Sequence, residues 1–433
     1  MRQWMVAAKK ADFYAIAEKF HVDPVVARII RNREVIGEKN IRIYLGGNLS
    51  DLSDPHQMKD MDRLVEILAQ KIRKQVHIRI IGDYDVDGVT SSHLFLTALR
   101  RVGAKVDVVI PHRIQDGYGL SLHLLQQAKE DGVDTILTCD NGIAAIDEIA
   151  WAKAQKMTVL VTDHHAVPFE EHEGRRTEKK SLADAVVNPH QQDCRYPYKE
   201  LCGAGVAWNV IRVLYENYDM DKREAEDLLD FVAMATVCDV MSLTGENRIL
   251  VKEGLKRIRH TKNIGLQALM QACNVQPENI SAYHFGYVLG PCVNATGRLD
   301  TARHALRLFE TGQETEAEEI ARDLVDLNQE RKELTLQGVE MAKKLCEEGG
   351  YENDPILVLF LPDVHESIAG LIAGRIREMY NRPVFVLTRG EEGVKGSGRS
   401  TENYSMYENM CGCAELFTKF GGHPMAAGLS LQK

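Results

Sequence analysis

The chain has 433 residues, of which 44% are hydrophobic and 27% charged, an ordinary composition for a globular protein of two or three domains. It contains no run of about 18 apolar residues, which excludes a predicted membrane span, and its start lacks the apolar core and cleavage site of a secretory signal. A formal net charge of −10 argues against a protein that grips long duplex DNA by its phosphates, although bound divalent cations would invert the field of an acidic cleft.

Nine cysteines, an odd number, are scattered along the chain rather than paired at regular spacings. Only Cys411 and Cys413 lie close together, and no second pair completes a zinc site around them. We therefore expect reduced thiols and a cytoplasmic protein, with these two cysteines as ordinary thiols.

The first 75 residues are predicted to form an irregular helical lead-in, with helical spacing over 54–74. Continuously apolar strands are then predicted at 76–82, 106–112, 134–140, 158–165 and 184–189, and helices at 89–102, 121–130 and 144–156. Strands of this kind, each followed by a helix, indicate a parallel sheet covered on both faces. We assign residues 76–312 to this α/β domain, in which the pattern is almost wholly helical from residue 203 onward.

A long charged stretch predicts a solvated helix, and we assign residues 313–350 to a helix that connects two domains. A smaller α/β domain follows at 351–433, with predicted strands at 355–362 and 383–389, a helix at 370–380 and a strand or turn at 393–400. The sequence therefore predicts two α/β lobes that face each other across a cleft. Because it stops within what reads as a strand, we expect the second domain to be truncated.

The stretch IGDYDVDGVTSS, residues 81–92, places Asp83, Asp85 and Asp87 directly after an apolar strand. Like charges this close repel, and burying each one costs several kcal/mol unless a positive charge compensates it. The stretch is therefore either a solvated acidic turn or a metal site.

Acidic and histidine residues recur at the carboxyl ends of later strands, with Asp140 after the third strand and Asp163, His164 and His165 after the fourth. A single aspartate at such a place is most often a cap, but ligands bind outside the carboxyl ends of parallel strands. Carboxylates with one or two imidazoles suit Mn²⁺ or Mg²⁺ better than zinc. Their number indicates two ions that activate a water in phosphoester hydrolysis.

In this order and spacing, DYDVDG, TCDNG and TDHH resemble the DHH phosphoesterase superfamily. Seven further motifs narrow the resemblance to the bacterial RecJ-like single-stranded-DNA-specific exonucleases, and the last two of them resemble the associated DHHA1 domain. The motifs are IPHRIQDGYGL (110–120), VNPHQQDCRYPYKELCGAGVAW (187–208), VCDVMSLTGENRILV (237–251), GPCVNATGR (290–298), HESIAGLIAGRI (365–376), GSGRS (396–400) and FGGHPMAAGLS (420–430).

The resemblance implies a role for individual residues of the site. The implied metal ligands are Asp85, Asp87, Asp140, His164 and Asp239. The implied catalytic groups are His165, placed near the scissile phosphate, and Asp83 in the acidic motif. The implied substrate contacts are Arg298, Ser397, Arg399 and His423, which would hold the 5′ end and line the same cleft.

Several of these positions have an alternative structural interpretation. Asp239 follows an apolar helix, where a buried cap is as good an interpretation as a ligand. Arg298 is expected at a helix start and could form a surface salt bridge, although a guanidinium fits a phosphate better than an ammonium does. Gly421 and Gly422 could form a simple turn. Cys292 stands where many relatives carry arginine, so one phosphate contact of the family is expected to be missing.

The resemblance implies a metal-dependent 5′-to-3′ exonuclease that hydrolyses single-stranded DNA to mononucleotides in DNA repair and recombination, with two ions of Mn²⁺ or Mg²⁺. The implied partners are single-stranded DNA, a single-strand-binding protein and a helicase. One alternative is a DHH phosphodiesterase on short oligonucleotides or cyclic dinucleotides, which would be shorter and lack DGYGL and GENRILV. Another is a non-catalytic replication scaffold, which would have lost ligands. An inorganic pyrophosphatase would carry a histidine within IRIIGDYD, which has none.

Overall fold

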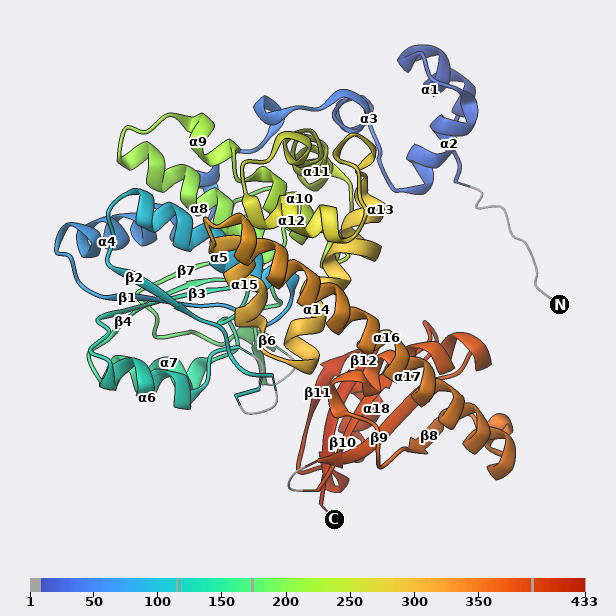
Figure 1. Ribbon diagram of the computed structural model, residues 1–433. Coiled ribbons are helices and arrows are strands. Elements are labelled where there is room, and N and C mark those ends of the chain that lie inside the picture. Colours follow the sequence, from blue (N-terminus) through green and yellow to red (C-terminus); the bar gives the residue numbers. More distant parts are fainter. Residues whose placement is uncertain (1–8, 114–115, 118, 173–174, 391–392, 433) are drawn as a thin grey trace. The chain divides into compact units, whose positions relative to one another are not determined.

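The computed structural model describes residues 9–113, 116–117, 119–172, 175–390 and 393–432. The chain divides into two compact units, the first comprising Met1–Asn294 and Thr301–Arg322, and the second Ala295–Asp300 and Asp323–Lys433 (Figure 1). Among the described residues, no helix combines the length and the apolarity that a membrane crossing requires.

The first unit is built on a five-stranded parallel sheet with the strand order β2-β1-β3-β4-β7, which confirms the predicted fold class (Figure 1). The apolar runs of the central strands are buried because helices cover both faces of the sheet, α6 and α7 on one face and α5 and α8 on the other. The strands are β1 (Ile78–Ile81), β2 (Val106–Val109), β3 (Thr135–Cys139), β4 (Thr158–Thr162) and β7 (Ala185–Val187).

Helices make up the rest of the first unit, as the sequence pattern predicts. The lead-in forms α1 (Phe13–Phe20), α2 (Pro24–Asn32), α3 (Glu38–Gly46) and α4 (Met61–Arg73). The sheet is flanked by α5 (Val86–Arg101), α6 (Leu122–Glu130), α7 (Ile146–Ala154) and α8 (Gly203–Asn217). The helical part continues with α9 (Lys222–Glu226), α10 (Leu229–Cys238), α11 (Gly245–Arg257), α12 (Ile264–Ala272), α13 (Ala282–His284), a π-helix (Phe285–Leu289) and α15 (Ala302–Glu310). Between the π-helix and α15 lies α14 (Gly290–Leu299), whose residues up to Asn294 belong to the first unit and the rest to the second.

A small hairpin between β4 and β7 has no counterpart in the predicted elements. Its strands β5 (Phe169–His172) and β6 (Arg175–Glu178) pair antiparallel as a separate two-stranded sheet. Charged residues predominate in both strands, so neither an apolar run nor an alternating pattern marks them in the sequence.

The second unit contains a mixed five-stranded sheet with the order β11-β12-β10-β9-β8, in which only β8 and β9 run parallel. The predicted connecting helix is confirmed as α16, which packs with α17 against one face of this sheet. The elements are α16 (Glu314–Gly349), β8 (Leu357–Phe360), α17 (Glu366–Tyr380), β9 (Val384–Gly390), β10 (Gly393–Arg399), α18 (Met406–Cys411), β11 (Lys419–His423) and β12 (Ala426–Leu431).

From the sequence, two glycines of this unit could have formed a simple turn, but the structure places both of them in a β-strand. Gly421 and Gly422 lie inside β11, paired with Gly428 and Ala427 of β12. The φ angle of Gly422 is 155°, and a Cβ atom there would lie 2.3 Å from the carbonyl oxygen of Ala426. Glycine is therefore required by the close approach of two strands rather than by a turn.

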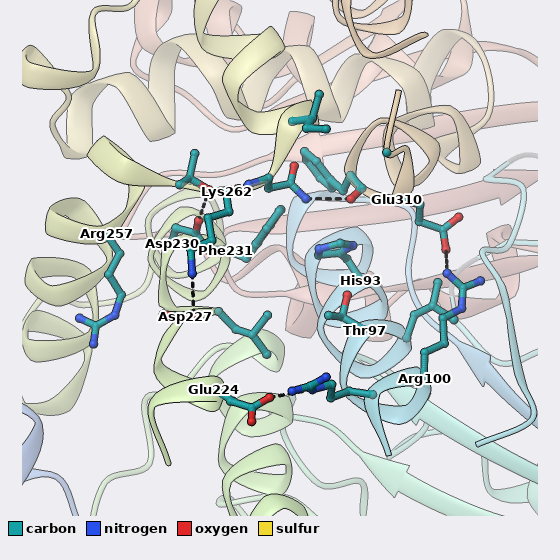
Figure 2. Close-up of a pocket in the computed structure, with 18 of the residues that line it drawn as sticks. His93, Thr97, Arg100, Glu224, Asp227, Asp230, Phe231, Arg257, Lys262 and Glu310 are labelled. Carbon is teal, nitrogen blue, oxygen red and sulfur yellow. Dashed lines mark hydrogen bonds and ion pairs between the residues drawn. The ribbon is translucent and has the colours of Figure 1, made fainter. Parts of the chain in front are cut away.

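A pocket of about 1010 Å³ opens among α5, α10 and α15 of the first unit (Figure 2). Its floor is aromatic, with the ring of Phe231 centred 4.4 Å from His93 and 5.0 Å from Phe309. At its mouth, Arg100 and Glu310 form an ion pair of 3.4 Å (Figure 2). None of the predicted site residues is among the described residues that line this pocket.

Candidate metal centre

The acidic stretch forms a tight loop between the end of β1 and the first turn of α5. Asp85 caps the helix, accepting a hydrogen bond of 3.1 Å from the Gly88 amide, and Asp83 and Asp87 are each only 1% exposed. A Cβ atom at Gly88 would lie 2.4 Å from the carbonyl oxygen of Asp83, so only glycine lets the loop close. The stretch is therefore buried, and it is not a solvated turn.

Three predicted carboxylate ligands from separate elements converge on a fourth predicted ligand, His164. Its Nε2 atom lies 3.1 Å from Oδ1 of Asp140, 3.6 Å from Oδ2 of Asp87 and 3.7 Å from Oδ2 of Asp239. Asp140 and His164 follow β3 and β4, whereas Asp239 caps the C-terminus of α10. The carboxyl ends of parallel strands meet at one edge of a sheet, which is why residues so distant in sequence gather here.

Three groups of three side chains could each hold a metal ion. Within each group, the ligand atoms lie within 4.8 Å of one another. Asp83, predicted as a catalytic group, lies among these carboxylates, and Asp85 shares its group. The groups are Asp140, His164 and His165; Asp87, His164 and Asp239; and Asp83, Asp85 and Asp140.

Backbone amides at the start of α8 bind one of these carboxylates. Asp87 accepts hydrogen bonds of 2.6 Å from the Gly203 amide and 2.8 Å from the Ala204 amide. A Cβ atom at Gly203 would lie 2.6 Å from Cβ of Asp140, so glycine is needed for this approach. The positive end of the helix thus compensates part of the buried charge. Sequence reasoning missed this contact, which the GAG of residues 203–205 could have indicated.

His165 is held by Asp163, which was noted at a strand end but given no role. The Asp163 Oδ1 atom lies 2.8 Å from His165 Nδ1, and its carboxylate also accepts hydrogen bonds from the amides of Ile143 and His164. Burial alone would raise the pKa of Asp163, but these hydrogen bonds outweigh it and lower that pKa. Burial likewise opposes charge on His165, yet the Asp163 contact raises its pKa to about 9. In the metal-free site, this contact favours the imidazolium form of His165.

Burial sets the protonation of the other acidic groups. It raises the pKa of Asp83 and Asp140 well above the ordinary value, with neighbouring carboxylates adding to the effect. Burial and then Asp87 raise the pKa of Asp85, and they raise that of Asp239 to about 8. Repulsion between carboxylates was expected from the sequence, but burial is the larger cause. Burial also lowers the pKa of His164, which favours the neutral imidazole that metals bind.

The cluster fits a divalent cation. Oδ1 of Asp83, Nε2 of His164 and Oδ2 of Asp239 are buried and, among the described residues, have no hydrogen-bond partner. Such atoms are expensive to bury unless something positive occupies the space between them. Carboxylates with one or two imidazoles suit Mn²⁺ or Mg²⁺. The arrangement therefore has the shape and the chemistry of a site for one or two such ions.

An arginine near the acidic loop also escaped the sequence reasoning. The guanidinium carbon of Arg113 lies 4.6 Å from the ring centre of Tyr84, and its charge acts to lower the pKa of Asp83. It belongs to the IPHRIQDGYGL motif, of which residues 114–115 and 118 lie outside the described residues. Its place beside Tyr84 makes Arg113 a further candidate for contact with a phosphate.

The predicted substrate contacts gather in the second unit. Arg298 lies in the last turn of α14, not at a helix start as expected, and its Nη1 atom donates a hydrogen bond of 2.7 Å to the Ser367 carbonyl. Arg399 Nη1 lies 3.3 Å from Ser397 Oγ on β10. A Cβ atom at Gly370 would lie 2.7 Å from Ser397 Oγ and 2.8 Å from Arg399 Nη2, so the first turns of α17 leave room for both side chains.

His423 lies on the same row of the sheet as Arg399. Both residues pair with Ala426, His423 from β11 and Arg399 from β10. Residues directly opposite one another share a face, so the two side chains are on one face, about 10 Å apart across two strand spacings. The structure thus brings Ser397 and Arg399 into contact and sets His423 at the side of this pair.

Divalent cations should stabilise the protein more as the pH rises. In the metal-free protein, the raised carboxyl pKa values contribute stability at low pH that is lost as the pH rises through about 8, the pKa of Asp239. A cation has to displace these protons, so the gain in Tm on adding Mn²⁺ should be largest above this pH and shrink toward mildly acidic pH. Thermal unfolding with Mn²⁺ and with EDTA across this range checks this, and a gain independent of pH would contradict it.

Replacing Asp163 by asparagine should lower the pKa of His165 from about 9. The change removes the negative charge while keeping an acceptor for the backbone amides, and a loss of roughly 1–2 pH units follows from the strength of a charged hydrogen bond. NMR titration of the imidazole rings in the metal-free protein measures it. His93, whose burial lowers its pKa to about 3, serves as the internal control. If His165 still titrated near 9 in the Asp163→Asn variant, Asp163 would not be the residue that raises its pKa.

Comparison with known proteins identifies the family of the chain. Residues 77–236 match the DHH family, N-terminal domain, and residues 353–433 match the DHHA1 domain. The single-stranded-DNA-specific exonuclease RecJ of Haemophilus influenzae is 36% identical over 428 residues, which cover 95% of this chain and 72% of that protein. RecJ of Bacillus subtilis is 34% identical, with 96% of this chain and 51% of that protein covered.

Solved structures extend the likeness to the fold. RecJ of Thermus thermophilus in complex with Mn²⁺ matches with a TM-score of 0.81 and 29% identity, over 99% of this chain and 59% of that one. An exonuclease RecJ bound to manganese matches with a TM-score of 0.74 and 32% identity, over 87% of this chain and 91% of that one. The chain thus spans between about half and most of the length of these relatives. On sequence, fold and site together, it belongs to the RecJ family.

Proposed function

We propose that this chain is a divalent-metal-dependent exonuclease that removes mononucleotides from the 5′ end of single-stranded DNA. The observation that carries the proposal is the convergence of His164 with Asp87, Asp140 and Asp239 in a buried site. The two relatives compared above by sequence are named single-stranded-DNA-specific exonucleases, and the RecJ of Thermus thermophilus was solved in complex with Mn²⁺ and with Mg²⁺. These names support the substrate and the metal proposed here.

The metal ligands in this proposal are the carboxylates and the imidazole of the cluster. Bound Mn²⁺ or Mg²⁺ supplies the activation of a water and the stabilisation of charge on the phosphate. The chain holds the ligands in place through the Asp85 cap of α5 and through the two α8 amides on Asp87. The proposed ligands are Asp85, Asp87, Asp140, His164 and Asp239, with Asp83 completing the group of three carboxylates.

His165 is the proposed group beside the scissile phosphate. Its Nδ1 atom contacts Asp163, which raises the pKa of the ring and favours its protonated form. An imidazolium can donate a hydrogen bond to a phosphate oxygen and stabilise charge that grows as the bond breaks. Because His165 Nδ1 is also 4.0 Å from Asp140, the ring lies at the edge of the metal cluster.

The proposed contacts to the 5′-terminal phosphate are Arg298, Ser397 and Arg399, and His423 is proposed to line the same cleft. A terminal phosphate carries more negative charge than an internal one, so arginines near it select the chain end. That the second unit presents these groups across a cleft toward the metals stays a prediction. The proposed setting is DNA repair and recombination, with a single-strand-binding protein and a helicase as partners.

A non-catalytic scaffold is disfavoured because every predicted ligand position carries a side chain that can coordinate a cation. A phosphodiesterase for short oligonucleotides or cyclic dinucleotides would have the same metal chemistry. An activity assay distinguishes this alternative from the proposed exonuclease. Mn²⁺-dependent digestion of end-labelled single strands should release mononucleotides, with cyclic dinucleotides and pyrophosphate as competing substrates in parallel reactions. Cleavage of these small substrates but not of strands would overturn the proposal.

Replacing Arg399 by alanine should remove most of the preference for a 5′ phosphate. A hydrogen bond to a charged group contributes about 1.5–3 kcal/mol, which corresponds to roughly tenfold to more than a hundredfold in binding. Strands of one sequence with a 5′ phosphate or a 5′ hydroxyl are compared by their kcat/KM values. Arg389→Ala, on the exposed surface of neighbouring β9, is the matched control. A variant that keeps the preference, or a wild type that digests from the 3′ end, would show that the pocket is wrongly assigned.

A further inference from the structure

Two tyrosines stand exposed at the start of the segment that leads into α14. Tyr283 is 64% exposed and Tyr287 is 73% exposed, whereas large aromatic side chains of soluble proteins are more often largely buried. Their rings stack on each other, with centroids 5.1 Å apart and planes 24° apart. These stacked rings form an aromatic surface on α13 and the π-helix that follows it, a part of the chain that is yellow in Figure 1.

The backbone beneath these tyrosines is a π-helix, Phe285–Leu289, a form that is frequent at functional sites. Its inward residues Phe285 and Leu289 are completely buried. The segment is therefore anchored firmly to the core, and the outward position of the tyrosines is not a consequence of loose packing.

The π-helix packs directly against the last turn of α10, which ends at the candidate ligand Asp239. Cys238 Sγ donates a hydrogen bond of 3.3 Å to the Phe285 carbonyl. A Cβ atom at Gly290 would lie 2.3 Å from Cys238 Sγ, so only glycine allows this approach. The aromatic surface is thus connected to the metal centre through a tight backbone contact.

The helix that continues from this segment then reaches the acidic loop. Asn294 Oδ1 accepts a hydrogen bond of 3.2 Å from the amide of Val86, which lies between two candidate ligands. Tyr287 lies seven residues before Asn294 in the chain, so the aromatic surface and the contact to the metal loop belong to one continuous helical segment.

We propose that Tyr283 and Tyr287 form a stacking surface for bases of the strand beyond the linkage that is cleaved. The inference rests on the proposed function, because it requires a single strand at the metal centre. Aromatic faces bind unpaired bases of any sequence by stacking, so this surface fits single-stranded nucleic acid. It would hold a strand without requiring the positive charge that this acidic chain lacks overall.

The test compares strands that are long enough to reach the tyrosines with a dinucleotide that is not. Binding is measured with labelled, 5′-phosphorylated strands in EDTA, where no cleavage occurs, and KM is measured with Mn²⁺. In Tyr283→Ala and Tyr287→Ala, the affinity advantage of the long strand over the dinucleotide should shrink roughly 5- to 100-fold. Tyr→Phe at either position should retain it, because the ring remains. Tyr14→Ala, at a tyrosine 77% exposed on α1, is the matched control.

The possible outcomes distinguish failure of the stacking surface from failure of the proposed exonuclease function. Alanine variants that keep the full advantage of the long strand would overturn the stacking surface, as would a Tyr→Phe variant that loses it. A wild type that binds strands without cleaving them would defeat the proposed function instead, and the binding measurements in EDTA would still decide whether the tyrosines hold bases.

Discussion

The burial of several carboxyl groups around one imidazole is the constraint that organises the first unit. Asp83, Asp87 and Asp140 are almost completely excluded from solvent, and water cannot compensate their charge. The chain supplies part of the compensation itself, through the amides at the start of α8 and through the protonated His165. The remaining uncompensated negative charge of the carboxylates explains why their pKa values are raised. It also explains why the site is expected to bind divalent cations.

The surrounding architecture follows from the need to bring these groups together. A parallel sheet sends the carboxyl end of every strand to one edge, so each strand can deliver a residue to the same place. Helices α5 and α8 begin at that edge, and glycines let their first turns approach: Gly88 against Asp83 and Gly203 against Asp140. Larger residues at either glycine would push the loops apart before any ligand geometry could form.

The sequence was enough to predict three features of the structure: the apolar strands, the connecting helix and the convergence of acidic groups. The strands and the helix have strong local patterns, and the acidic groups lie at strand ends. Other features depend on contacts that no local pattern records. The β5–β6 hairpin is mostly charged, and Gly421 and Gly422 were interpreted as a possible turn although they lie in paired strands. Arg298 was expected to begin a helix that it ends. Asp163 carried no signal of its role, because the contact that gives it one depends on how the loop after β4 folds back on His165.

The all-parallel sheet also has a consequence for the kinetics of folding. Ile78 of β1 pairs with Thr135 of β3, so the central strands join only after a long intervening segment has been ordered. Contacts of such sequence separation form slowly. The acidic groups that follow these strands can meet only once those strands have paired. A cation that binds the completed site would then leave the folding rate almost unchanged and act by slowing unfolding, which makes it a determinant of the protein's lifetime.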